Sequence, residues 1–361
     1  MAQRLTTAPI SPAKSPATPD FRAWRARTLL ALMAAATAVI APMPFLGNAS
    51  GHDFEFHVAS WMETAAQWRQ GIFYPRWAEW ANWGFGEPRF IFYPPGSWIA
   101  GAAMGVVLPW RVVPGAFIWL CLVVAGMSMW KLAREWLGGP QAMVAAVLYA
   151  VNPYQIVMVY YRSDFAELLA GALFPLVLWG AVRVARGDWR SVPWLAVIFG
   201  GIWISNAPAA VMATYSLTLA LVVGCIVRRS ARPLIPGATA MVGGFGLAAF
   251  YILPAAWEQR WVQISQAVND ELLPLHNFLF TRLNEEGFVR FNWKVSYVAL
   301  GAIVVTIAAT AFAARRRRES PDVWWIAAAL GAAALFLMLP PSALLWRYLP
   351  KLAFMQFPWR W

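Results

Sequence analysis

Long apolar runs recur along this chain, and short clusters of arginine and lysine separate them. Residues 295–314, for example, form an apolar run that ends on four consecutive arginines, residues 315–318. A helix needs about 20 mostly apolar residues to cross a bilayer, and basic clusters mark the loops that stay in the cytoplasm. The pattern therefore predicts an all-α polytopic membrane protein.

The composition agrees with this prediction and excludes other classes. Hydrophobic residues make up 60% of the chain, charged residues only 13%, and the mean hydropathy is +0.52, well outside ordinary globular usage. The net charge of +12 is divided among the basic clusters, so we expect no nucleic-acid partner. Cys121 and Cys225 both lie in apolar runs, which favours buried thiols over a disulfide or a metal site.

The chain divides into a tail and a membrane domain. Residues 1–27 are rich in Pro, Ala, Ser and Thr and carry basic residues, which predicts a disordered basic cytoplasmic tail. Residues 28–361 form a transmembrane domain of about nine spans, with outer loops at 48–96 and 255–292. A cleaved signal peptide is the alternative for residues 28–47, but both its apolar and its basic region would be unusually long. Residues 98–108 are too short for a span and should lie at the outer interface.

The first outer loop, residues 48–96, is acidic and aromatic between apolar runs. A loop this long is usually functional or disordered, and its many Trp and Phe residues argue against disorder. Asp53, Glu55 and His57 would share one face of a strand, and Asp53 and His57 would share one face of a helix. They could bind a metal, act as a base or orient an acceptor hydroxyl. The alternative is that Asp53 only caps a helix.

A second acid pair, Asp164 and Glu167, follows Arg162 on the same predicted side of the membrane. The spacing puts both carboxylates on one helix face, but it is also the pattern of a capping box. Glu167 lies near the membrane boundary, where an ionisable group is costly without a partner or a function. Arg162 is the nearest candidate partner.

Four arginines lie on the outer side among aromatic residues: Arg76, Arg89, Arg162 and Arg360. Because their position runs against the usual charge bias of membrane proteins, some could bind an anionic group such as a lipid phosphate. The alternative is that they anchor the chain at the interface.

The order of these features resembles the GT-C superfamily of membrane glycosyltransferases, which use polyprenyl-phosphate-linked sugars. In both, a first membrane helix leads into a large outer loop that opens with an acid, and a second outer acid follows after two more spans. The resemblance implies that Asp53 binds substrate or metal and that Asp164 and Glu167 are the second-loop acids. The turn at residues 93–96 is similar in position to the Lys-Pro-Pro segment of that superfamily, although the lysine is absent here.

Four segments also resemble bacterial multispanning proteins labelled YfhO-like or 6-pyruvoyl-tetrahydropterin synthase-related. These segments are GHDFEFHVASW, IFYPRWAEWANWGFGEPRFIFYPPG, YRSDFAELLAGALFPLVLWG and MQFPWRW. They cover most of the outer-face sequence between residues 51 and 180, together with the end of the chain. The resemblances imply a GT-C-like helical bundle with a large first extracytoplasmic loop, in the bacterial inner membrane. The basic flank of the first apolar run predicts a cytoplasmic N-terminus.

From the resemblances we expect a glycosyltransferase that moves a sugar from a polyprenyl-phosphate donor to a glycan or lipid acceptor on the outer face. The expected catalytic residues are Asp53, Asp164 and Glu167, and Asp53 and Asp164 could hold Mg²⁺ or Mn²⁺. The expected substrate-binding residues are His57, Arg89, Tyr93, Arg162 and Arg360. The alternative is a non-catalytic protein of lipid or polysaccharide transport or assembly, although the spans carry few of the charges that ion-coupled transport would favour.

Overall fold

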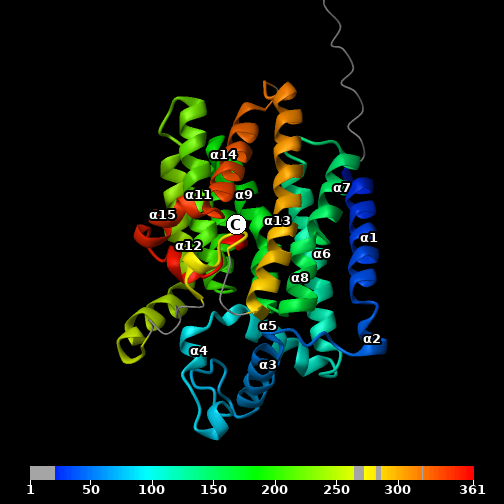
Figure 1. The fold of residues 1–361 in the computed structure, drawn as a ribbon, viewed down its shortest axis with the longest axis vertical. Helices are drawn as coiled ribbons and strands as arrows, with labels where there is room; N and C mark the ends of the chain where they lie inside the picture. Colours follow the sequence, from blue (N-terminus) through cyan, green and yellow to red (C-terminus); the bar gives the residue numbers. More distant parts are fainter. Residues whose placement is uncertain (1–20, 264–271, 282–285, 319) are drawn as a thin grey trace, which may run out of the picture.

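The computed structural model describes residues 21–263, 272–281, 286–318 and 320–361. These residues form helices and connecting turns, and no β-strand occurs among them apart from one isolated bridge between Ala78 and Glu87. The prediction of an all-α membrane protein is confirmed (Figure 1).

Within the described residues, seven helical segments are long and apolar enough to cross a membrane. They are α1 (Phe21–Ile40) with α2 (Met43–Leu46), α6 (Val113–Ala133), α7 (Gly139–Ala150) with α8 (Pro153–Val157) and η2 (Met158–Arg162), α9 (Phe165–Ala185), α11 (Ala207–Arg228), α12 (Leu234–Glu258) with η4 (Gln259–Trp261), and α13 (Glu286–Ala313) from Phe291 onward. An eighth crossing would be bent by 92° between α14 (Pro321–Leu337) and the segment of η9 (Pro340–Ser342) and α15 (Ala343–Tyr348).

The predicted span at residues 193–205 corresponds to α10 (Val192–Trp203), which has only 12 residues. Such a helix is about 18 Å long, shorter than the roughly 30 Å hydrocarbon core, so it is not among the seven. The other predicted span missing from the seven is residues 323–339, which lie mainly in α14 with 17 residues. Helix α10 packs closely on α12, because a Cβ on Gly200 would lie 2.9 Å from the carbonyl oxygen of Gly244. Close contact through small residues is typical of helix pairs in membranes.

The segment between the first two long spans is folded and forms one end of the molecule (Figure 1, blue to cyan). It contains α3 (Phe54–Arg69), η1 (Asn82–Gly84) and α4 (Arg89–Phe92), and it leads into α5 (Pro95–Val107). Helix α5 is apolar but too short to span, as the sequence predicts for residues 98–108. Large rings bury this end against the bundle: Trp61, Phe90, Trp98, Phe117 and Phe165.

The ends of the described chain depart from the sequence-based boundaries. Helix α1 begins at Phe21, so the boundary expected at residue 28 falls inside a helix, and residues 1–20 lie outside the described residues. In the outer loop expected at 255–292, residues 264–271 and 282–285 also lie outside them. Residues 352–361, which we expected at the outer face, fold back against the helices, and label C lies near the middle of the view in Figure 1. Their buried side chains include Leu352, Met355, Trp359 and Arg360.

Candidate functional site

The start of the first outer loop docks onto the turn between η2 and α9. The backbone N–H of Asp53 donates to the carbonyl oxygen of Arg162 at 2.7 Å. The N–H of Gly51 donates to Oγ of Ser163 at 3.0 Å. Ser163 itself has a positive φ of 53°, so a sharp left-handed turn presents these acceptors. These backbone contacts therefore bring Asp53 beside Arg162, although the two residues are far apart in the sequence.

This docking depends on a glycine, which gives a first testable prediction. A Cβ on Gly51 would lie 2.5 Å from the carbonyl oxygen of Tyr161 and 2.7 Å from the carbonyl carbon of Arg162. Both are backbone atoms that cannot turn aside, so Gly51→Ala should destabilise the protein by about 1–3 kcal/mol and separate Asp53 from Arg162. Thermal unfolding in detergent would measure the effect.

The matched control is Gly246→Ala in α12, where an added Cβ meets nothing within 4 Å. This change should leave stability unaltered or raise it by up to about 1 kcal/mol, because alanine restricts the unfolded chain and favours the helix. Equal unfolding temperatures for the two variants would contradict the close docking at Gly51.

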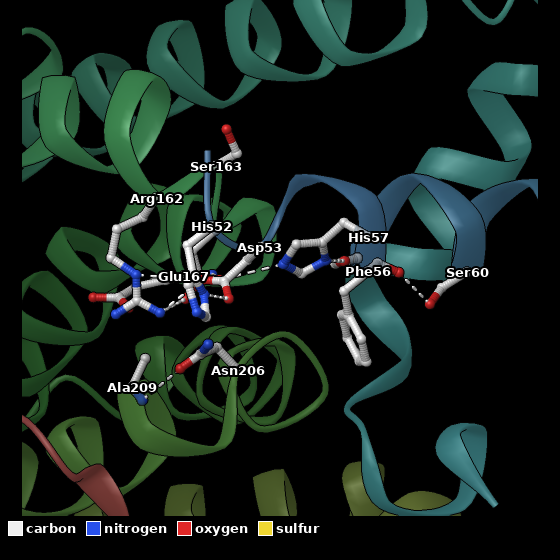
Figure 2. A network of polar contacts seen from close by, with 12 residues as sticks. His52, Asp53, Phe56, His57, Ser60, Arg162, Ser163, Glu167, Asn206 and Ala209 are labelled. Carbon is white, nitrogen blue, oxygen red and sulfur yellow. Dashed lines mark hydrogen bonds and ion pairs between the residues drawn. The ribbon is translucent and has the colours of Figure 1, made fainter. Parts of the chain in front are cut away.

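Asp53 is turned toward an arginine. It occupies the N-cap position of α3, but its side chain makes no capping hydrogen bond. Its Oδ2 accepts from Nη2 of Arg162 at 2.6 Å and from Nε at 3.2 Å, and Oδ1 lies 2.7 Å from Nδ1 of His52. Figure 2 shows the guanidinium of Arg162 directed at this carboxylate. The capping alternative for Asp53 is therefore wrong.

Asp164 does cap its helix, since its Oδ1 accepts from the backbone N–H of Glu167 at 2.9 Å. Oδ1 also lies 3.5 Å from Nε2 of His57. Oδ2 lies 3.8 Å from Nη2 of Arg162 and 3.8 Å from Nη2 of Arg360. Burial opposes ionisation, but the contact with His57 and the charges of Arg162 and Arg360 outweigh it and hold the pKa of Asp164 well below its usual range. Asp164 is therefore an anion at neutral pH.

Glu167 follows one helical turn later and has two partners. Its Oε2 lies 3.1 Å from Nε of Arg360, and its Oε1 accepts a hydrogen bond from the hydroxyl of Tyr154. The side chain of Arg360 is only 5% exposed, and its Nη1 donates to the carbonyl oxygen of Met355 at 2.9 Å. The inward fold of the last residues therefore delivers a buried cation to the acids.

Two arginines thus join three acids in a continuous row. Arg162 links Asp53 to Asp164, and Arg360 links Asp164 to Glu167. We call these five residues the acid–arginine row. All five are candidates that the sequence singles out, and the structure brings them together.

Two further candidates lie beside the row. The ring of His57 is 1% exposed and packs edge-on against Tyr93 and Phe165, with ring centroids 5.7 and 5.5 Å apart. Burial, followed by the charges of Asp164 and Asp53, raises the pKa of Tyr93 well above its ordinary value. The phenol of Tyr93 therefore keeps its proton, and His57 is shielded from solvent.

Arg89, by contrast, does not join the row. Its Nε donates to Oε1 of Glu87 at 2.5 Å and its Nη1 to Oγ of Ser60 at 3.1 Å. Its guanidinium also lies 4.4 Å from the ring centroid of Phe56. These contacts tie α4 to α3, so its position supports a structural role rather than the expected substrate contact.

The row presents paired charges rather than a ready metal site. A guanidinium lies between the carboxylates of Asp53 and Asp164, and the described residues contain no group of three or more His, Cys, Asp or Glu side chains placed to hold an ion. A divalent cation prefers several oxygen ligands, so it would have to replace Arg162 at both carboxylates. Binding of Mg²⁺ or Mn²⁺ stays a prediction that this arrangement does not favour.

A largely apolar cavity of about 810 Å³ adjoins the row. Its walls come from α7–α9, α11, α13, α14 and the last residues of the chain, and Tyr154, Glu167 and Arg360 are among its polar lining groups. Along α13 the lining runs from Val295 to Ala311, which corresponds to about 24 Å of helix. A cavity with this length and polarity suits a lipid chain with an anionic head.

Sequence reasoning missed this cavity and Tyr154. Helix α13 is apolar around its whole circumference in this region, so no stripe in its sequence separates a cavity wall from a lipid-facing surface. The one available signal was Arg360, a charged residue within an otherwise apolar and aromatic ending.

Comparison with known families gives one match. The model of a family described as "6-pyruvoyl-tetrahydropterin synthase related domain; membrane protein" matches residues 90–357. The matched region includes Asp164, Glu167 and most of the cavity lining, whereas Asp53 and His57 precede it. No curated protein matches the chain.

Proposed function

The chain belongs to the 6-pyruvoyl-tetrahydropterin synthase related family of membrane proteins, and for this member we propose glycosyl transfer from a lipid-linked donor. The donor is a sugar carried on a polyprenyl phosphate, and the acceptor is a glycan or lipid hydroxyl on the outer face of the membrane. The observation that carries the proposal is the continuity between the acid–arginine row and the apolar cavity, because Glu167 and Arg360 belong to both.

The cavity and the row divide the work of binding. The prenyl chain lies along α13 and α14, where apolar burial stabilises it by roughly 25 cal/mol per Å². The phosphate lies at Arg360, which exchanges its contact with Glu167 for the more strongly charged group. A guanidinium forms paired hydrogen bonds with phosphate oxygens.

In the transfer step, the bond between the sugar C1 and the phosphate oxygen breaks, and its electron pair leaves with the phosphate. A bond forms between C1 and the oxygen of the acceptor hydroxyl, whose proton passes to a carboxylate of the row. Asp53 suits the role of base, because its side chain is 21% exposed and that of Asp164 only 7%. Arg162 and Arg360 stabilise the charge that develops on the leaving phosphate.

The experiment uses the purified protein in lipid nanodiscs with a panel of radiolabelled polyprenyl-phosphate hexoses and N-acetylhexosamines. Release of polyprenyl phosphate from at least one donor, dependent on an added acceptor glycan, would support transfer. If every donor remains intact while the protein moves it across a vesicle membrane, the transport alternative is correct. The cavity favours that alternative as a second candidate, because a lipid-binding cavity also suits a lipid carrier.

The proposed location is the bacterial inner membrane, with the N-terminus and residues 315–318 in the cytoplasm. The described basic clusters after α11 and α13 lie at the end of the molecule opposite α3 (Figure 1), as the positive-inside rule requires. This orientation places the acid–arginine row toward the outer face.

Cysteine labelling tests the orientation. In a chain whose two native cysteines are replaced by serine, a membrane-impermeant maleimide should label Glu79→Cys in intact cells. Ala231→Cys, between α11 and α12, should react only after the cells are permeabilised, and both positions are exposed. The opposite pattern would invert the topology and remove the row from the outer side.

A further inference from the structure

The imidazole of His57 lies between two buried polar side chains, one at each ring nitrogen. Nδ1 is 3.3 Å from Oγ of Ser97, and Nε2 is 3.5 Å from Oδ1 of Asp164. Ser97 is fully buried and His57 is 1% exposed. Neither residue lines the cavity, so a substrate in the cavity does not touch them.

The chemistry of the two partners decides where the imidazole proton lies. An ionised carboxylate only accepts hydrogen bonds, whereas a serine hydroxyl can donate or accept. A bare Nε2 would set two acceptors against each other in a buried place, which costs about 1–3 kcal/mol. With the proton on Nε2, the N–H faces Oδ1 of Asp164 in a 3.5 Å contact that is longer than a good hydrogen bond, and Nδ1 accepts from the hydroxyl of Ser97. If both ring nitrogens carried a proton, the N–H at Nε2 would still face Asp164.

The carboxylate of Asp164 is consequently held on one side only. Its Oδ1 receives the backbone N–H of Glu167 at 2.9 Å and faces Nε2 of His57. Its Oδ2 faces the guanidinium groups of Arg162 and Arg360 at 3.8 Å each, beyond hydrogen-bond distance. Oδ2 is therefore the oxygen of Asp164 that faces both guanidinium groups of the row.

We propose that His57 is a positioning residue that, with Ser97 behind it, holds Oδ1 of Asp164 and directs Oδ2 toward Arg162 and Arg360, so that both guanidinium groups stay in place for the leaving phosphate. The role in transfer rests on the proposed function, whereas the place of the proton rests on the contacts alone. The expected substrate-binding role of His57 is replaced by this indirect one, because the ring lies behind Asp164 and outside the cavity.

A pair of conservative variants separates positioning from simple packing. The amide nitrogen of His57→Gln can reach the place of Nε2, whereas that of His57→Asn reaches only the place of Nδ1. We expect His57→Gln to keep most of the turnover. His57→Asn should lower kcat by about tenfold to hundredfold, as for other residues that orient a reactive group, with little change in the KM of the donor. Ser97→Ala should cause a smaller loss.

Thermal unfolding of each variant would show whether the two amides are equally stable. Equal kcat values for His57→Gln and His57→Asn at equal stability would overturn the positioning role. A rise in donor KM without a loss of kcat in His57→Asn would also overturn it, because direct substrate binding would then be the better explanation.

A second measurement needs no substrate. The chain contains three histidines, so ¹⁵N-histidine labelling of the full protein in nanodiscs gives three imidazole rings, and the ring lost in His57→Gln identifies His57. We expect a protonated Nε2 whose signal moves in Asp164→Asn. A bare Nε2 with the proton on Nδ1 would overturn this inference even if transfer occurs. If no donor supports transfer, the proposed function is wrong, but the inference that Nε2 of His57 carries the proton is unaffected.

Discussion

Asp53→Asn is expected to lower the release of polyprenyl phosphate by roughly a hundredfold or more, since a catalytic base contributes about that factor. The asparagine keeps the size of the side chain but cannot take the acceptor proton. The unfolding temperature should change little, because Asp53 makes no capping hydrogen bond and the amide oxygen of asparagine can still accept from Arg162. The measurement is turnover of the labelled donor in nanodiscs at matched protein level.

Glu55→Gln provides the matched control for Asp53→Asn. Glu55 is an exposed carboxylate in the first turn of the same helix, so its loss should leave turnover and stability unchanged. Full turnover in Asp53→Asn would remove Asp53 from the catalytic step and leave another carboxylate of the row to take the acceptor proton.

Arg360→Met is expected to destabilise the protein by about 3–5 kcal/mol, the usual cost of removing one partner from a buried ion pair. The change leaves the buried carboxylate of Glu167 without its cation and takes one of two arginines from Asp164. Thermal unfolding in detergent measures the loss. Arg347→Met is the control, because Arg347 is exposed and such surface changes usually stay within about 0.5 kcal/mol.

Adding Glu167→Gln to Arg360→Met should recover part of the lost stability. The second change removes the orphaned charge and keeps an oxygen that accepts from the hydroxyl of Tyr154. Unfolding of Arg360→Met at the wild-type temperature would show that Arg360 is not a buried counter-ion. Additive losses in the double variant would show that Glu167 and Arg360 do not act as a pair.

The sequence predicted those features that depend on local spacing. Asp164 and Glu167 lie three residues apart before an apolar run, and the capping hydrogen bond follows directly from that spacing. The short apolar run at residues 98–108 became the short helix α5. Apolar length also indicated most of the spans, because the bilayer sets the same minimum length for each.

Features that depend on tertiary contacts could not be predicted from the sequence. The N-cap position of Asp53 gave no sign that its side chain turns to Arg162, because the docking of Gly51 onto Tyr161 and Arg162 decides that direction. The sequence paired Asp53 with His57 by spacing, whereas the structure pairs His57 with Asp164. The apolar run at residues 193–205 suggested a span. The sequence did not show how short the helix would be, because the turn at residues 204–206, between α10 and α11, sets its end.

The cavity adjoining the acid–arginine row can be tested directly with a polyprenyl phosphate that carries a photoreactive group near the end of its chain. After illumination in nanodiscs, mass spectrometry of the digested protein locates the attached lipid. Labelling should fall on α13 and α14, at cavity residues such as Thr306 and Ala328, and excess unlabelled polyprenyl phosphate should abolish it. Labelling confined to exposed apolar residues outside the cavity, such as Val242 and Phe250 of α12, or unaffected by the competitor, would contradict a single lipid-binding site formed by the row and the cavity.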